Sequence, residues 1–547
     1  MTAIKKYEKL KVQDPFAILP LKQDPTGCHF QNKCGSRAFL KIQGMMRNTG
    51  KISLFLLGIH LIAISQQSVA HSATSTRSLS LPEAVRVALK NNVGIQIEKE
   101  NIRLQESSFF WEEAQFDPAL SFDLRANKTI RSSSSLIETG PSGTERIVQE
   151  NQRLNAGITQ RFRSGGDAGL VLRQFRSSAS FQGVNPTLNG DLVISFRQPL
   201  LKGFGREITE GPIRIANTQI EISQSVFEAQ VTTLVLDVSN AYWDLVFQIK
   251  NLEVQRQNLK SAKQLLTSSR EKVDMGLFAP IEILVAESGV ASREEAVFIA
   301  EKGVRDTEDE LRLLLNLPDQ LTISPANIQP TDQPIEKEQS IDSNSLLHQA
   351  ITLRPEMAEN KLHLRNQSLF AKIAKNKVSP SLDLVGSVGL NGLGRDFSDE
   401  ADQLESGRFN QWEAGFVLSF PIGNHAAWAD VQKEKIKLKQ AMFNEKRLIQ
   451  QITLERKEGL RRVQTDFQRI EVTKRARRLA EEKYAAGNER FNLGLISSHN
   501  LLEFQDDLAN AQGNELKAVI DYNKSLANLS HVTGALRQQY QIETVSR

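Results

Sequence analysis

Histidines, cysteines and one glycine-rich segment are the residues of this chain that could support metal, thiol or phosphate chemistry. The eight histidines form no HExxH or other metal-ligand spacing. The segment KGFGRE at 202–207 lacks the lysine–serine end of a phosphate-binding loop. The carboxylates are scattered along helical stretches, where they are typical of solvated faces. The sequence therefore predicts that the protein is not an enzyme and binds no cofactor or metal ion.

An apolar segment near the N-terminus has the features of an export signal. Residues 52–70 carry no charge and follow Arg47 and Lys51. Their apolar core, 52–64, is too short to span a bilayer, and small residues suited to signal cleavage end the segment. This order favours a signal peptide at 45–70 over the alternative of a buried core helix. Residues 1–44 are then an N-terminal extension, and the true translation start is left open between Met1 and the methionine pair 45–46.

The charge of the chain changes once these N-terminal residues are set aside. Ten of the 68 basic residues but only three of the 64 acidic residues lie before residue 52, which leaves 58 basic and 61 acidic residues. A nearly balanced, slightly acidic chain gives no indication of nucleic-acid binding. Cys28 and Cys34 also precede the predicted cleavage site, so we expect a mature chain without disulfides, thiolate metal sites or a lipid-bearing cysteine.

The remaining sequence is internally duplicated. Residues 88–124 align without a gap to residues 350–386, at an offset of 262. Both segments have a helical pattern that ends at a proline, Pro118 or Pro380, and alternating apolar and polar residues follow each proline. We predict a first repeat at 71–335 and a second repeat at 336–547.

The alternating segments predict strands long enough to cross a membrane. They lie at 119–128, 191–199, 381–390 and 412–420. The first half contains two further strand-like runs, 154–162 and 168–175, without counterparts in the second half. Two alternatives remain open for this pair: it enlarges a barrel formed by these strands, or it extends a hairpin outside it.

Each half also predicts two long helices that pack as a coiled coil. No proline lies between Pro212 and Pro280, and none follows Pro421. Apolar residues keep a 3,4 spacing through 231–266, 283–314 and 501–529. Helices over 213–273 and 426–484 would each measure roughly 90 Å. In the second of them, Lys474 and Arg477 break the heptad register, so we expect looser packing there.

The turns between the long helices match each other at an offset of 218. This alignment places Gly276 and Leu277 over Gly494 and Leu495. Glycine suits a helix end at which the chain must reverse, because it adopts positive φ without penalty. The match predicts two equivalent helical hairpins whose tips lie at the same level.

In this order, the duplicated segments resemble the TolC-like outer-membrane efflux family. The features that carry the resemblance are LSLPEAVRVALKNN at 79–92, LLHQAITLRPEM at 346–357, FRQPLLKGFG at 196–205 and the two glycine–leucine tips. The resemblance implies an α+β fold, mostly α, in which long helical hairpins form a periplasmic α-barrel. It also implies a homotrimer whose strands complete one β-barrel in the outer membrane. Outer-membrane lipid would surround that barrel, and several chains must contribute strands to it, since open strand edges cannot remain unpaired in a bilayer.

The resemblance also suggests functional positions at the tips. Carried over from Gly494, the gate positions of the family fall on Asn500 and Glu503, and Glu282 is the first-half residue equivalent to Asn500. Glu503 would form a ring of three carboxylates that attracts cations. Its alternative role is that of an ordinary solvated carboxylate. Exposed residues at the tips, namely Gly276, Leu277, Gly494 and Leu495, are candidates for docking a periplasmic adaptor, with simple turn chemistry as the alternative.

These observations predict a passive exit duct in the outer membrane. It would belong to a tripartite efflux or type I secretion system, with a periplasmic adaptor protein and an inner-membrane pump as partners. The alternative is a periplasmic coiled-coil adaptor or structural protein, which would explain the heptads but not the duplicated strands. The class of substrate, whether drug, metal or protein, is not encoded in any of these patterns.

Overall fold

The computed structural model describes residues 76–132, 146–179, 185–317, 327–342 and 345–542. The predicted extension at 1–44 and the predicted signal peptide at 45–70 lie outside these residues. The helices are α2 (Leu81–Asn91), α3 (Val93–Glu113), η2 (Ala114–Phe116), α5 (Arg206–Thr209), α6 (Gly211–Asp274), α7 (Ile281–Leu315), α8 (Ser345–Leu353), α9 (Pro355–Lys377), α10 (Phe397–Ser406), α11 (His425–Asn492), α12 (Ser498–Val532) and α13 (Leu536–Gln539). The strands are β1 (Thr76–Leu79), β2 (Ala119–Ser132), β3 (Arg146–Arg161), β4 (Asp167–Ala179), β5 (Thr187–Pro199), β6 (Asn327–Pro330), β7 (Ser381–Gly394) and β8 (Asn410–Ser419).

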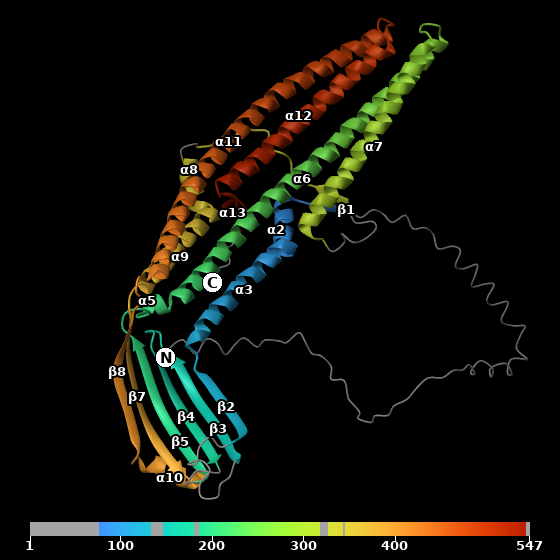
Figure 1. Cartoon of the computed structure of the whole chain (residues 1–547). Coiled ribbons are helices and arrows are strands. Elements are labelled where there is room, and N and C mark those ends of the chain that lie inside the picture. The colour runs from blue at the N-terminus through green and yellow to red at the C-terminus, as the bar shows by residue number, and fades with distance from the viewer. Residues whose placement is uncertain (1–75, 133–145, 180–184, 318–326, 343–344, 543–547) are drawn as a thin grey trace, which may run out of the picture. The chain divides into compact units, whose positions relative to one another are not determined.

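The two longest helices confirm the prediction made from the absence of proline. Helix α6 has 64 residues and α11 has 68, which corresponds to about 96 and 102 Å. Helix α11 continues past the predicted end at residue 484 as far as Asn492. Each long helix reverses into a 35-residue partner, α7 or α12. The resulting hairpins run side by side, with both tips at the same end (Figure 1).

The predicted heptad seams form the core of these hairpins. Val238 and Leu245 of α6 and Leu311 of α7 are completely buried, and they belong to one apolar cluster. The second hairpin buries Val463 and Ile470 of α11 against Ala518 and Tyr522 of α12. Packing of a and d residues therefore stabilises both hairpins, as the 3,4 spacing predicts.

The predicted weak segment of α11 is also observed. No residue of α11 between Ile470 and Gly487 is buried. Arg477, one of the two residues that break the register, forms ion pairs with Glu481 and with Glu515, a seam residue of α12. Charged groups thus replace apolar seam contacts in this segment, which is less buried than the preceding part of α11 from Ile452 to Ile470.

The strands form a six-stranded antiparallel sheet in the order β2-β3-β4-β5-β7-β8. All four predicted strands are confirmed as β2, β5, β7 and β8, and each begins or ends within a few residues of its predicted bounds. The additional runs form β3 and β4, which lie inside the sheet between β2 and β5 and so enlarge it. The features that were not predicted include the short parallel pair β1–β6 and the helix α10 between β7 and β8.

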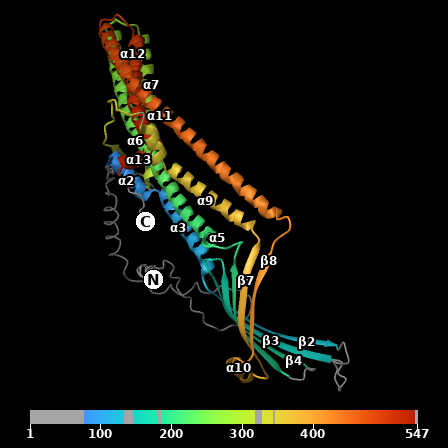
Figure 2. The same ribbon diagram turned by 90° about the vertical axis from the view of Figure 1, so that its left-hand side faces the viewer.

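Four helices adjoin the sheet along the chain: α9 precedes β7 and α11 follows β8, whereas α3 and α6 are joined to β2 and β5 through η2 and α5. Helix α3 packs against α6, α6 against α9, and α9 against α11, as the side view in Figure 2 also shows. The helices preceding β2 and β7 are interrupted at equivalent places, Asn92 and Arg354, which differ by the same offset of 262 as the repeats. The fold is mostly helical with an antiparallel sheet, so the predicted fold class is confirmed in this form.

Within the part of the chain that the structure describes, no helix combines the length and the apolar character needed to cross a membrane.

Candidate functional site

The two helical tips have nearly identical backbone geometry. Gly276 and Gly494 both have φ of +74°. The amide of the following leucine donates to the carbonyl of Lys272 in the first tip and of Arg490 in the second, at 2.9 Å in each case. This pattern ends a helix only if the residue at the left-handed position tolerates positive φ, which favours glycine. Leu277 and Leu495 follow the glycines and are 67% and 64% exposed.

Two of the three predicted gate residues form hydrogen bonds at the start of α12. The carboxylate of Glu282 accepts a hydrogen bond from the Ser498 amide, 2.7 Å away, and so joins the start of α7 to the start of α12. The side chain of Asn500 accepts a hydrogen bond from the hydroxyl of Ser497 at 2.8 Å, within the N-cap of α12. Glu503 lies on the exposed face of α12, one turn further along.

Further contacts between the tips involve Lys272, which no sequence pattern singles out. Its side chain is only 9% exposed, and its amino group lies 3.8 Å from the ring centroid of Phe491 and 5.2 Å from that of Phe278. The same amino group donates to the Phe491 carbonyl. Burial lowers the pKa of Lys272. Close by, the hydroxyls of Ser269 and Ser498 are hydrogen-bonded at 3.0 Å.

A second cation, Arg293 of α7, joins the hairpins one level away from the tips. It is 6% exposed and donates to the carboxylate of Asp506 at 2.7 Å and to the carbonyl of Leu502 at 3.1 Å, both on α12. Burial lowers the pKa of Arg293, although Asp506 opposes this effect. The sequence contained a signal for this contact, because Arg293 occupies a seam position in an otherwise apolar heptad.

The sheet has one apolar and one polar face. One row of paired residues crosses all six strands and consists entirely of large apolar side chains that are exposed in the single chain: Leu120, Ile158, Leu170, Ile194, Val388 and Trp412. A row on the opposite face crosses five strands and is polar: Asp123, Asn155, Arg173, Asp191 and Asn391. Such alternation is typical of strands that lie between lipid and water.

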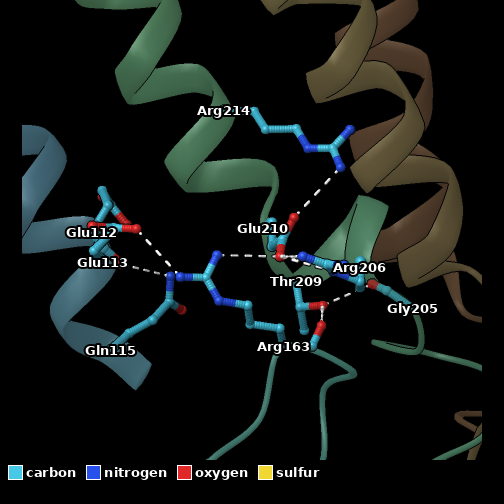
Figure 3. A network of polar contacts seen from close by, with 9 residues as sticks. All are labelled: Glu112, Glu113, Gln115, Arg163, Gly205, Arg206, Thr209, Glu210 and Arg214. Carbon is cyan, nitrogen blue, oxygen red and sulfur yellow. Dashed lines mark hydrogen bonds and ion pairs between the residues drawn. The ribbon is translucent and has the colours of Figure 1, made fainter. Parts of the chain in front are cut away.

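A charged network joins the sheet to the helices (Figure 3). Arg163, in the turn between β3 and β4, donates to Glu113 at the end of α3 and to Glu210 at the start of α6, at 3.3 Å each. Glu210 also accepts hydrogen bonds from Arg206 at 2.9 Å and from Arg214 at 3.5 Å. Burial alone would raise the pKa of Glu210, but these hydrogen bonds outweigh it and lower the pKa. Arg163 therefore holds the turn between two helix ends.

Comparison with known proteins places this architecture in a class of channel proteins. The family model described as "Outer membrane efflux protein" matches residues 88–317 and 346–535. Nodulation protein T of Rhizobium leguminosarum bv. trifolii is 22% identical over 356 residues, which cover 64% of this chain and 72% of that protein. The pyoverdine export outer membrane protein OpmQ of Pseudomonas putida is 25% identical over 315 residues, 54% of this chain and 62% of OpmQ.

The fold is similar to that of solved outer-membrane channels. The crystal structure of the Campylobacter jejuni CmeC outer membrane channel superimposes with a TM-score of 0.63 at 16% identity, covering 83% of this chain and 85% of CmeC. Together, the helical hairpins and the two-faced sheet define a class of outer-membrane channel. The chain belongs to the outer membrane efflux protein family, which confirms the predicted resemblance. It is an outer-membrane efflux channel protein and not an enzyme, and the family match favours this function over the alternative of a periplasmic adaptor.

Proposed function

We propose that three copies of this chain form one continuous duct, which receives solutes from an inner-membrane pump and a periplasmic adaptor and releases them outside. In this arrangement each copy contributes its six strands to one barrel in the outer membrane and its long hairpins to a periplasmic tube. The two predicted repeats, 71–335 and 336–547, supply one hairpin each.

The observation that supports ring formation is that the two edges of the subunit are complementary. Strands β2 and β8 are the edge strands of the sheet, and they run in opposite directions because every pair in the six-stranded sheet is antiparallel. An edge of β2 can therefore pair with β8 of a second copy without breaking the pattern. Unpaired strand edges are excluded from lipid, so copies must join until the ring closes.

The helices beside these edges point to the same association. Helix α3 exposes Ile97, Leu104 and Trp111, spaced seven residues apart, and α11 exposes Ile436 and Phe443 with the same spacing. Seven-residue repeats of apolar residues are typical of helix pairs. Contact between α3 of one copy and α11 of the next would bury both series.

The oligomeric state tests this proposal. The mature protein, extracted in mild detergent, should have three times the mass of one chain by light scattering after subtraction of bound detergent. It should also migrate as a heat-modifiable band on SDS gels. A monodisperse monomer that remains in the outer-membrane fraction would contradict the trimer.

At the periplasmic end, we propose that the tips close the duct and that Glu503 contributes its charge to the entrance. Its exposure on α12 leaves its carboxylate available to ions. Asn500 and Glu282 would act there by holding the start of α12 through Ser497 and Ser498. Gly276, Leu277, Gly494 and Leu495 would present the two exposed leucines to the adaptor, since exposed apolar groups on a polar surface favour a partner.

A further inference from the structure

The β3–β4 hairpin interrupts the internal duplication of the chain. The second half contributes two strands to the sheet, β7 and β8, whereas the first half contributes four. The additional pair is inserted between β2 and β5, which correspond in the duplication to the neighbouring strands β7 and β8. Because two strands were added, the directions of all the others are unchanged.

The inserted strands have the same two faces as the rest of the sheet. Ile158 of β3 and Leu170 of β4 continue the apolar row, and Asn155 and Arg173 continue the polar row. A hairpin packed outside the sheet would not need this register. The strands β3 and β4 therefore fit a position in the wall of the barrel, with one face toward lipid and the other toward water.

The turn of the inserted hairpin is fixed to the helical part of the molecule. Arg163 lies between the end of α3 and the start of α6, where it bridges Glu113 and Glu210 (Figure 3). Thr209 donates to the carbonyl of Arg163 at 2.6 Å. Gly165 lies against the Gly203 carbonyl so closely that a β-carbon there would be 2.3 Å from its oxygen. These contacts hold the β3–β4 turn against the segment that leads from β5 into α6.

The width of the sheet explains what the insertion achieves. Four helices, α3, α6, α9 and α11, pack side by side and lead into or out of the sheet along the chain, and at about 9.5 Å per helix they span about 38 Å. Six strands, spaced about 4.8 Å apart and tilted by about 40°, span about 38 Å along the barrel circumference. Four strands would span only about 25 Å. The insertion thus makes the sheet as wide as the layer of helices.

We propose that the β3–β4 hairpin widens the outer-membrane outlet to the bore of the helical tube, so that the duct passes large hydrophilic solutes without narrowing in the membrane. This inference rests on the proposed trimer. Three copies of six strands make eighteen, with a backbone radius of about 18 Å and, after about 5 Å for side chains, a clear radius of about 13 Å. Without the insertion the clear radius would be about 7 Å. The wide outlet admits two α-helices of about 10–12 Å side by side, and the narrow one admits a single helix.

Polymer exclusion in planar bilayers tests the outlet directly. Polyethylene glycols of graded size are added only to the compartment that faces the β7–β8 connection, and the fall in conductance reports which polymers enter. For the full mature chain we expect entry up to a radius of about 13 Å. In a variant lacking residues 146–179, strands β2 and β5 become neighbours with Leu120 still level with Ile194, so the sheet keeps its register. This variant has four strands per copy and should exclude polymers with a radius above about 7 Å. Equal cut-offs in the two proteins would overturn the proposal.

Cysteine labelling provides a second test that does not depend on the deletion variant. The mature chain after residue 70 contains no cysteine, so single substitutions can be read without background. In proteoliposomes, Asn155→Cys should react with a water-soluble maleimide and Ile158→Cys should not, because their side chains lie on opposite faces of β3. Equal labelling at both positions, or labelling only at Ile158→Cys, would overturn the assignment of this hairpin to the barrel wall.

The two tests separate this inference from the proposed function. A protein that forms no trimer and no conducting pore contradicts both. A trimeric pore that excludes polymers above about 7 Å contradicts only the wide outlet.

Discussion

At the scale of single residues, the hairpins carry two kinds of charge with different surroundings at and near their tips. Glu503 is exposed on α12, whereas Lys272 and Arg293 are buried between the hairpins. An exposed carboxylate near a pore acts on passing ions, and a buried cation acts on the groups that surround it. Substitutions at these positions should therefore change different properties of the channel.

Glu503→Gln should reduce the preference of the channel for cations. In the proposed trimer this substitution removes three carboxylates from one level of the entrance, which weakens the local negative potential without changing side-chain size. The measurement is the reversal potential in a potassium chloride gradient across a planar bilayer. Glu482→Gln is the control, because its side chain is 66% exposed on α11 outside the tip. An unchanged reversal potential for Glu503→Gln would show that this carboxylate is simply solvated.

Arg293→Met should make the two hairpins separate more readily. The substitution removes the hydrogen bonds to Asp506 and Leu502 and costs about 1–2 kcal/mol. A change of this size alters a two-state population roughly 5- to 30-fold, so the fraction of time in the open state should rise by that factor in single-channel recordings.

Arg270→Met serves as the matched control for Arg293→Met. Arg270 pairs with Glu287 within one hairpin, and both side chains are about half exposed. Because this pair does not join the two hairpins, its loss should leave the open fraction unchanged. If both variants behave alike, the contact between hairpins does not control opening.

At the scale of elements, two regular patterns are interrupted: the heptad pattern of α11 and the internal duplication of the strands. The sequence predicted the first interruption and left the position of the second undecided. The register break in α11 was predicted because Lys474 and Arg477 fall on seam positions, and heptad position depends only on local spacing. The position of β3 and β4 was not predicted. Alternation shows that a segment is a strand with two faces, but it does not identify the neighbouring strand.

The junction between sheet and helices should be sensitive to acid through Glu210. Arginine hydrogen bonds lower the pKa of this carboxyl below its ordinary value of 4.5. A group whose pKa is lower in the folded state stabilises that state above the unfolded pKa, and this contribution is lost as pH falls through the folded pKa. The difference in melting temperature between the wild type and Glu210→Gln should therefore be largest at neutral pH and shrink below about pH 4.5.

Thermal unfolding followed by circular dichroism across this pH range measures the effect. Glu100→Gln is a suitable control, since Glu100 pairs with Arg103 on the surface of α3 and both side chains are well exposed. Exposed pairs contribute little to stability. A difference for Glu210→Gln that stays constant from pH 7 to pH 3 would contradict the role assigned to the ionised carboxylate.

At the scale of the whole molecule, the two faces of the sheet determine how the protein sits in the outer membrane. Ile194→Arg places a charge in the apolar row, which should destabilise the folded protein in lipid by about 2–4 kcal/mol if the row lies near the midplane. Ser195→Arg, one residue along β5, places the same charge on the polar face and should be nearly neutral. Urea unfolding in lipid vesicles, followed by tryptophan fluorescence, compares the two. Equal destabilisation would contradict the assignment of the faces.

The amino-acid sequence determined the parts of this structure that depend on local spacing. The duplication, the four strands of membrane-spanning length, the long proline-free helices and the glycine turns at Gly276 and Gly494 all follow from patterns within short segments. Such patterns fix secondary structure and the faces of each element, because backbone conformation and side-chain direction repeat every two or 3.6 residues.

Only the tertiary structure decided which of these elements meet. The contact of Lys272 with Phe491, the hydrogen bond from Ser498 to Glu282 and the bridge of Arg163 between α3 and α6 join residues far apart in the chain. No periodicity encodes such pairs, since they depend on how whole helices and strands pack in three dimensions. The insertion of β3 and β4 into the sheet is of the same kind, and it sets the width of the proposed outlet.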